Sequence, residues 1–200
     1  VVNNGIPLSR GIYRLFICGT PTLQDQAGNP INDGKDDVVT FPVGDTSLLP
    51  ATGFAPGKRT LISAQPADKI YTALGNIWLE IPSLDVKVPI VGVPGKANGW
   101  DTAWLNNQVG WLEGTAFPSW QGNSVLTAHV YGYDGKPGPF VNLKTLAYDQ
   151  RVIIHIYGQS YIFAVRSSQQ VYPQDTAYAF QHLEGNSYLT LITCQGYDAA

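Results

Sequence analysis

The chain has 200 residues, a formal net charge of −3 and only 14% charged residues. It carries no basic cluster that could neutralise a phosphate backbone, so we expect no nucleic-acid partner. With 21 Gly, 14 Pro and 12% aromatic residues, the composition favours a turn-rich, mainly β protein over a helical bundle or a disordered chain. No apolar run reaches the roughly 18 residues that a membrane-spanning helix needs.

The first 45 residues predict two strands joined by a long polar connection. β-branched and aromatic residues are concentrated in residues 11–18 and again in residues 38–43. So short a piece cannot bury a core of its own, so we expect residues 1–45 to be the last part of an upstream β domain, of the surface-protein kind. Because the chain contains no Met, we expect it to be a piece of a longer polypeptide.

Residues 46–69 are rich in small residues, Gly and Pro, and they show no sustained periodicity. This composition predicts a linker or an extended flap. Within it we define the signal-like segment, residues 49–53, whose sequence is Leu49, Pro50, Ala51, Thr52 and Gly53.

Residues 70–200 are expected to form one mainly β domain with short helices. Short apolar runs bounded by Gly or Pro predict its strands, at residues 77–81, 85–91, 124–130, 151–157, 160–166 and 187–194. A small antiparallel barrel would leave few strand edges exposed. Trp100, Trp104 and Trp111 recur at nearly helical spacing, which predicts a short amphipathic helix or turn in residues 99–113 with the tryptophans as packing groups.

Cys194 and His129 are the candidate catalytic pair. Each ends an apolar run and is followed by Gly-containing sequence, so both could meet at one mouth of a barrel. A thiol beside an imidazole provides a nucleophile and its acid/base partner. Without that partner, Cys194 would be interpreted as a packed thiol or as one half of a disulfide with Cys18. 

The other two histidines are weaker candidates. His155 lies inside an apolar run, which favours a structural or outward-facing role, and His182 lies in a polar stretch, where a solvated role is expected.

The runs Thr127-Ala128-His129 and Thr190-Leu191-Ile192-Thr193-Cys194 resemble the two signature strand ends of sortases, in the same order. The similarity extends from about residue 70 to residue 197. It implies an eight-stranded β-barrel and a cysteine transpeptidase without metal or cofactor. Cys194 would attack the Thr–Gly bond of a Leu-Pro-x-Thr-Gly-like sorting signal in a surface protein and form a thioester. His129 would protonate the leaving amine, and an amine acyl acceptor would resolve the thioester.

The resemblance also implies roles for the neighbours of Cys194. Thr193 matches a position that helps to stabilise the oxyanion, and the backbone N–H of Gln195 is a second donor. Residues 167–185 correspond to the loop that shapes the signal-binding groove. The family carries an arginine on a last strand after the cysteine, so we expect both to be missing from residues 1–200 and the activity of this piece to be reduced. We also expect action at the extracellular face, with tethering through parts outside this chain.

The signal-like segment matches the sequence that many sortases cleave. Residues 54–60 after it are neither an apolar anchor nor a basic tail, so it is not an ordinary wall anchor. Three interpretations remain open: a turn-rich linker, a pseudosubstrate that shields the groove, or a processing site between the upstream module and its own enzyme.

Two alternatives to an active sortase remain. The chain could be a non-catalytic β module of a cell-surface protein, with Cys194 packed, or a catalytically dead sortase fragment without the arginine. The L,D-transpeptidases also use Cys and His, but their Ser-His-Gly-x-x-x-Cys clustering is absent from this sequence.

Overall fold

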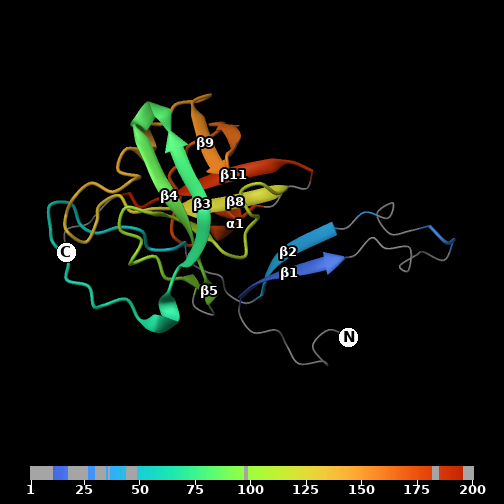
Figure 1. Cartoon of the computed structure of the whole chain (residues 1–200), viewed down its shortest axis with the longest axis horizontal. Helices are drawn as coiled ribbons and strands as arrows, with labels where there is room; N and C mark the ends of the chain where they lie inside the picture. Colours follow the sequence, from blue (N-terminus) through green and yellow to red (C-terminus); the bar gives the residue numbers. More distant parts are fainter. Residues whose placement is uncertain are drawn as a thin grey trace.

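The computed structural model describes residues 11–17, 27–29, 35, 37–43, 49–96, 99–181 and 185–195. These residues form a nearly closed, barrel-like sheet of seven strands, with a two-stranded hairpin beside it (Figure 1). The strands are β1 (Gly11–Ile17), β2 (Asp37–Val43), β3 (Thr72–Ile81), β4 (Val86–Val93), β5 (Gly95–Lys96), β6 (Gly99–Trp100), β7 (Val109–Leu112), β8 (Gly122–Thr127), β9 (Arg151–Ile156), β10 (Gln159–Ala164) and β11 (Ser187–Ile192).

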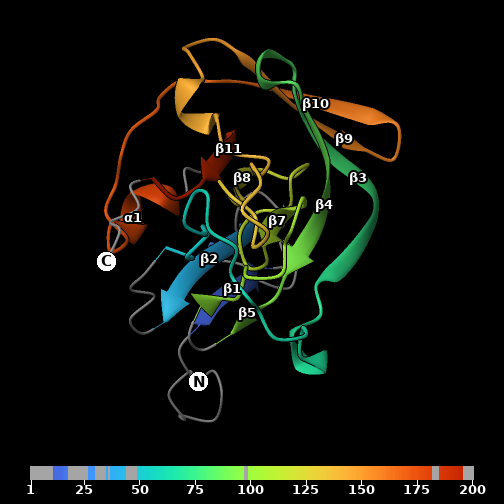
Figure 2. The same cartoon turned by 90° about the vertical axis from the view of Figure 1, so that its left-hand side faces the viewer.

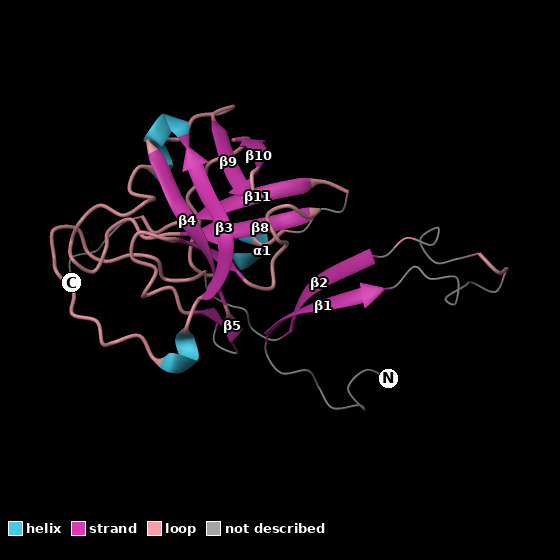
Figure 3. Cartoon of the chain, in the orientation of Figure 1, coloured by secondary structure: helices cyan, strands magenta, loops and turns pink. Residues whose placement is uncertain are grey.

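Helices are few and short, as Figure 3 shows in cyan. They are the helix α1 (Thr176–Ala179) and the 3-10 helices Ala67–Lys69, Pro82–Leu84 and Leu143–Thr145. The mainly β fold with short helices is therefore confirmed. No helix within the described residues has the length and the apolar character needed to cross a membrane.

The strands of the large sheet are ordered β10-β9-β3-β4-β7-β8-β11. The expectation of a wholly antiparallel barrel is wrong in two places, because β4 pairs with β7 and β8 pairs with β11 in parallel. Parallel neighbours require a long crossover connection. The chain from β4 to β7, which includes β5 and β6, and the chain from β8 to β11, which includes β9 and β10, provide one each. Figure 2 shows β8 and β11 side by side near the middle of the molecule, in agreement with their pairing.

The strand β8 is buried along its whole length, because apolar side chains cover both of its faces. Leu126 faces the main core with Leu79 and Ile154, whereas Val125 faces a second cluster. The second cluster is Val93, Leu105, Leu112, Val125, Ala179 and Ile192. A strand held between two packed cores has little freedom to move, so its end is a rigid place to present a side chain.

Of the short helix or turn expected in residues 99–113, the structure forms turns and no helix. The residues are instead in β6, a run of turns and β7, and Asn106 has a positive φ of 49°. A β-carbon at Gly110 would lie 2.5 Å from Val93 Cγ2. This glycine therefore allows β7 to pack closely against the side chain of Val93 in β4. The tryptophans are packing groups as expected: Trp111 is buried, and Trp100 stacks on Phe180.

The hairpin of β1 and β2 is antiparallel, as the sequence predicts for these two runs. It contacts the large sheet's connections through Arg14, whose guanidinium donates a hydrogen bond to the carbonyl of Thr115. The same guanidinium lies 5.3 Å from the ring centroid of Trp120. A cation over an aromatic face contributes on the order of 0.5–1 kcal/mol at such exposed sites.

Candidate active site

The adjacent ends of β8 and β11 position the two candidate catalytic residues. Their parallel register places Ile192 opposite Thr127, and continuing it by two residues brings Cys194 level with His129. Both strands end slightly before the limits expected from the sequence, so the two residues belong to the loops that follow directly. Such positions combine a fixed backbone with an accessible side chain.

Two hydroxyl groups bind these strand ends together. Thr127 Oγ1 donates a hydrogen bond of 3.0 Å to the carbonyl of Ile192, and Thr193 Oγ1 donates one of 2.9 Å to the carbonyl of Ala128. Each bond joins a residue of one strand end to the backbone of the other. Together they hold Cys194 and His129 at neighbouring positions.

The imidazole of His129 is almost wholly buried, at 1% exposure. Neither ring nitrogen has a hydrogen-bond partner among the described residues. Burial lowers the pKa of His129, and the nearby backbone of Thr52, Ala103 and Thr102 opposes the shift without making a hydrogen bond of normal geometry. The ring is therefore neutral at neutral pH and able to accept a proton from a thiol.

Cys194 is a free thiol and is half-buried. Its Sγ accepts hydrogen bonds from two groups of one residue, the backbone N–H of Thr52 at 3.2 Å and the Thr52 hydroxyl at 3.5 Å. Thr52 is itself fully buried. The partner that the sequence alternative offered for Cys194, Cys18, lies outside the described residues.

The signal-like segment thus occupies the site. Leu49 packs against the second cluster and donates its N–H to the carbonyl of Pro173 at 2.7 Å, and the Thr102 hydroxyl donates to the carbonyl of Ala51 at 2.9 Å. Directly after the segment, the ring of Phe54 lies 4.9 Å from that of His129, measured between centroids. Figures 1 and 2 trace this part of the chain in teal around the sheet.

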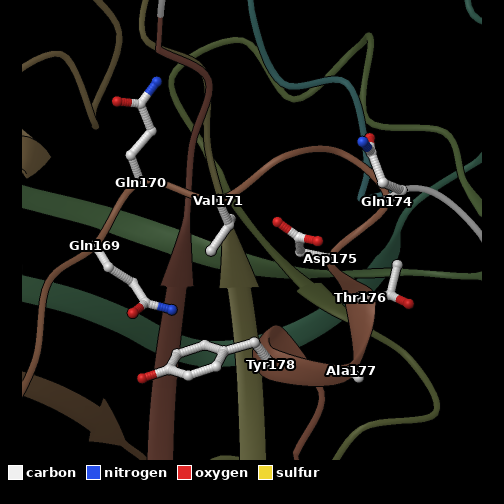
Figure 4. Close-up of a pocket in the computed structure, with 8 residues that line it drawn as sticks. All are labelled: Gln169, Gln170, Val171, Gln174, Asp175, Thr176, Ala177 and Tyr178. Carbon is white, nitrogen blue, oxygen red and sulfur yellow. The ribbon is translucent and has the colours of Figure 1, made fainter.

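An open hollow of about 520 Å³ lies next to this site, on the connection between β10 and β11 and on α1 (Figure 4). Its lining residues are Gln169, Gln170, Val171, Gln174, Asp175, Thr176, Ala177 and Tyr178. Neither Cys194 nor His129 belongs to the lining.

The structure brings together most of the residues that the sequence singles out. The hydroxyl of Thr193 is engaged with Ala128, and Gln195 is exposed beside Cys194. His155 lies apart, on the outside of β9, where it stacks on Trp78 with a centroid separation of 3.5 Å and bonds to Glu80. Its expected structural role is therefore confirmed, whereas His182 lies outside the described residues.

Three residues at the site could not be singled out from the sequence. Phe54 follows the signal-like segment directly, which is a weak signal. Thr102 and Pro173 contact the segment through single hydrogen bonds from distant loops, and no local pattern marks them.

Comparisons with known proteins assign this fold to one family. The family model described as Sortase domain matches residues 79–200. Sortase C-1 from Actinomyces oris is 30% identical with a TM-score of 0.51, and the match covers 62% of this chain and 66% of that protein. A lid mutant of sortase A from Corynebacterium diphtheriae is 27% identical with a TM-score of 0.52, and the match covers 67% of each chain.

A third structure is that of Clostridium perfringens sortase C with the C-terminal cell wall sorting motif. It is 30% identical with a TM-score of 0.50, and 63% of each chain is covered. This chain therefore spans about two thirds of the length of the sortases that it matches. No match was found among curated proteins. From the match to the family model and the sortase fold, we conclude that this chain belongs to the sortase family.

Proposed function

We propose that this chain provides the catalytic residues of a cysteine transpeptidase that cleaves a Leu-Pro-x-Thr-Gly-like signal between Thr and Gly. The acyl group would pass through a thioester to an amine acceptor. The observation that carries the proposal is the contact of Thr52, the threonine of such a sequence, with the Sγ of Cys194 beside His129. The sorting motif in the matched Clostridium perfringens structure supports the same substrate class.

In this mechanism, the neutral imidazole of His129 takes the proton of Cys194, and the thiolate attacks the carbonyl carbon of the substrate threonine. The imidazolium then protonates the leaving amine of the glycine, and the thioester stays on Sγ. A primary amine attacks the thioester and returns the thiol. Backbone N–H groups next to Cys194, that of Gln195 first, are the candidate donors for the oxyanion. Thr193 acts as a positioning residue through its bond to Ala128.

The substrate would be the sorting signal of a surface protein, and the reaction would take place at the extracellular face. Two features support a peptide substrate over a small metabolite. A peptide segment contacts the thiol through Thr52, and this segment is bound through its backbone at two residues, Leu49 and Ala51. Backbone recognition of an extended strand, with pockets for selected side chains, is a general mode of peptide binding.

The test is cleavage of an added Leu-Pro-x-Thr-Gly peptide by the purified protein in the presence of triglycine. Because the groove is occupied, the Leu49→Ala variant is assayed alongside the unchanged protein. We expect cleavage between Thr and Gly, transfer to triglycine, and an acyl adduct on Cys194 detectable by intact mass. The Cys194→Ala variant is the control. A folded Leu49→Ala variant that forms neither product nor adduct would reject the proposal in favour of a non-catalytic surface module or a catalytically dead sortase fragment.

A further inference from the structure

We propose that the signal-like segment is itself a substrate, and that Cys194 cleaves the bond between Thr52 and Gly53 within the same molecule. This inference rests on the proposed function of Cys194 and His129. It goes beyond that function because it assigns the chain its own processing site and two defined products.

The first argument is the pattern of contacts along the signal-like segment. Leu49 packs on the second cluster, Pro50 is buried and Thr52 is fully buried, whereas Ala51 is exposed. The four positions that a Leu-Pro-x-Thr-Gly sequence specifies, Leu49, Pro50, Thr52 and Gly53, are thus buried or half-buried, and the unspecified position is the exposed one. A segment that only covered the groove would not need this correspondence.

The second argument is the position of the bond. Thr52 is held at the nucleophile by two hydrogen bonds to Sγ, and Phe54 is held against the ring of the acid/base residue. The nitrogen of Gly53, which would be the leaving group, belongs to the single residue between them. Both hydrogen bonds of the segment to Sγ come from Thr52, the residue whose carbonyl would be attacked.

The third argument is the way the segment is held. Hydrogen bonds from Leu49 to Pro173 and from Thr102 to Ala51 fix the peptide on both sides of the buried Pro50. The tether also keeps it near the thiol at an effective concentration on the order of millimolar. A cis substrate with this arrangement needs no diffusional encounter before reaction.

The reaction balances with the groups present and one amine. The Cys194 thiolate forms an Sγ–C bond to the carbonyl of Thr52, the C–N bond to Gly53 breaks, and His129 gives its proton to the new amino group. A primary amine, or water in its absence, then displaces the thiolate and takes the acyl group. The products are residues 1–52 joined through Thr52 to the amine, and an enzyme domain that begins at Gly53. The β1–β2 hairpin would be part of the transferred product.

The experiment follows the purified protein over time with triglycine, by intact mass and N-terminal sequencing. We expect a fragment beginning at Gly53 and a fragment of residues 1–52 with the mass of triglycine added. The rate constant should not change with protein concentration. Cys194→Ala should give no fragment. Leu49→Ala should give the fragment at least tenfold more slowly, because the segment leaves the groove, whereas Leu61→Ala should match the unchanged protein. Leu61 lies in the same linker with its side chain 91% exposed.

Two results would overturn the inference alone, and a third would overturn the proposed function as well. If added peptide is cleaved but no fragment begins at Gly53, the segment only shields the groove. If the rate rises in proportion to protein concentration, the cleavage is between molecules. If the Leu49→Ala variant cleaves neither its own chain nor added peptide, the proposed function fails as well.

Discussion

Thr127 and Thr193 form a reciprocal pair across the ends of β8 and β11, each donating its hydroxyl to the backbone next to the other. Thr127 is fully buried and Thr193 is half-buried. The Thr127–Ile192 bond joins the residues two positions before His129 and Cys194, and the Thr193–Ala128 bond joins the residues one position before them. The two bonds therefore set the spacing between the thiol and the imidazole.

Replacing either threonine by valine keeps the shape and removes the hydroxyl. Thr127→Val leaves a buried carbonyl without its donor and should lower the free energy of unfolding by about 1–3 kcal/mol. Thr193→Val should cost about 1 kcal/mol, because its site is partly open to water. Urea unfolding measures both, with the matching serine variants as controls. Equal stability of Thr127→Val and Thr127→Ser would contradict the assignment.

Phe54 packs against the ring of His129, with 4.9 Å between the ring centroids. Burial lowers the pKa of the imidazole, and the Phe54 ring is part of what buries it. Phe54→Ala should therefore raise the pKa towards its ordinary value of about 6.5. A titration of the His129 ring signals by NMR measures the change, with Leu61→Ala as control. An unchanged pKa in Phe54→Ala would show that another group excludes the water.

The same shift predicts how stability depends on pH. In the folded state His129 has a lowered pKa, so the unfolded chain binds more protons in the range between the two values. This contribution to stability is complete above about pH 6.5 and is lost as the pH falls towards the lowered folded value. The melting temperature should fall less between about pH 7 and 5 in Phe54→Ala than in the unchanged protein.

The accessibility of Cys194 should report the position of the signal-like segment. Leu49 is half-buried, so Leu49→Ala should weaken docking by about 1–2 kcal/mol and speed alkylation of Cys194 by iodoacetamide about 5–30-fold. Leu61→Ala makes the same chemical change at an exposed position and should have no effect. Equal rates in the two variants would mean that Leu49 does not hold the segment in place.

Gly138 makes room for the backbone of His129. A β-carbon at Gly138 would lie 2.3 Å from the His129 carbonyl oxygen, which the packed end of β8 cannot accommodate without moving. Gly138→Ala should cost about 1–3 kcal/mol of stability and reduce peptide cleavage. At Gly132 the new carbon would meet only the side-chain oxygen of Asp134, at 2.9 Å, which can rotate away. Gly132→Ala should therefore cost about 1 kcal/mol or less.

The sequence could predict the strands and the catalytic pair because local signals mark them. Alternating apolar residues define β3 and β9, and the two family-like strand ends identify Cys194 and His129. In residues 99–113 the spacing of the tryptophans could not choose between a helix and a turn, and it missed the strand β7, where Gly110 packs against Val93. The spacing of apolar residues within one segment carries no information about a contact between two separate strands.

The occupation of the site by residues 49–53 could be suspected from their motif but not placed. It depends on Pro173, Thr102 and Phe54, which come from three separate parts of the chain. The parallel pairing of β8 with β11 also could not be predicted from the sequence, because strand order follows from long-range packing rather than from local composition.

The parallel pairing of β8 with β11 has a consequence for when the enzyme becomes reactive during folding. The hydrogen bonds that join the two strand ends connect residues 65 positions apart, with β9 and β10 lying between them in sequence. Contacts of such large sequence separation form late, after the local hairpins. The folding chain would therefore keep Cys194 apart from His129 through most of its folding, and the pair would be assembled only when β11 is in place beside β8.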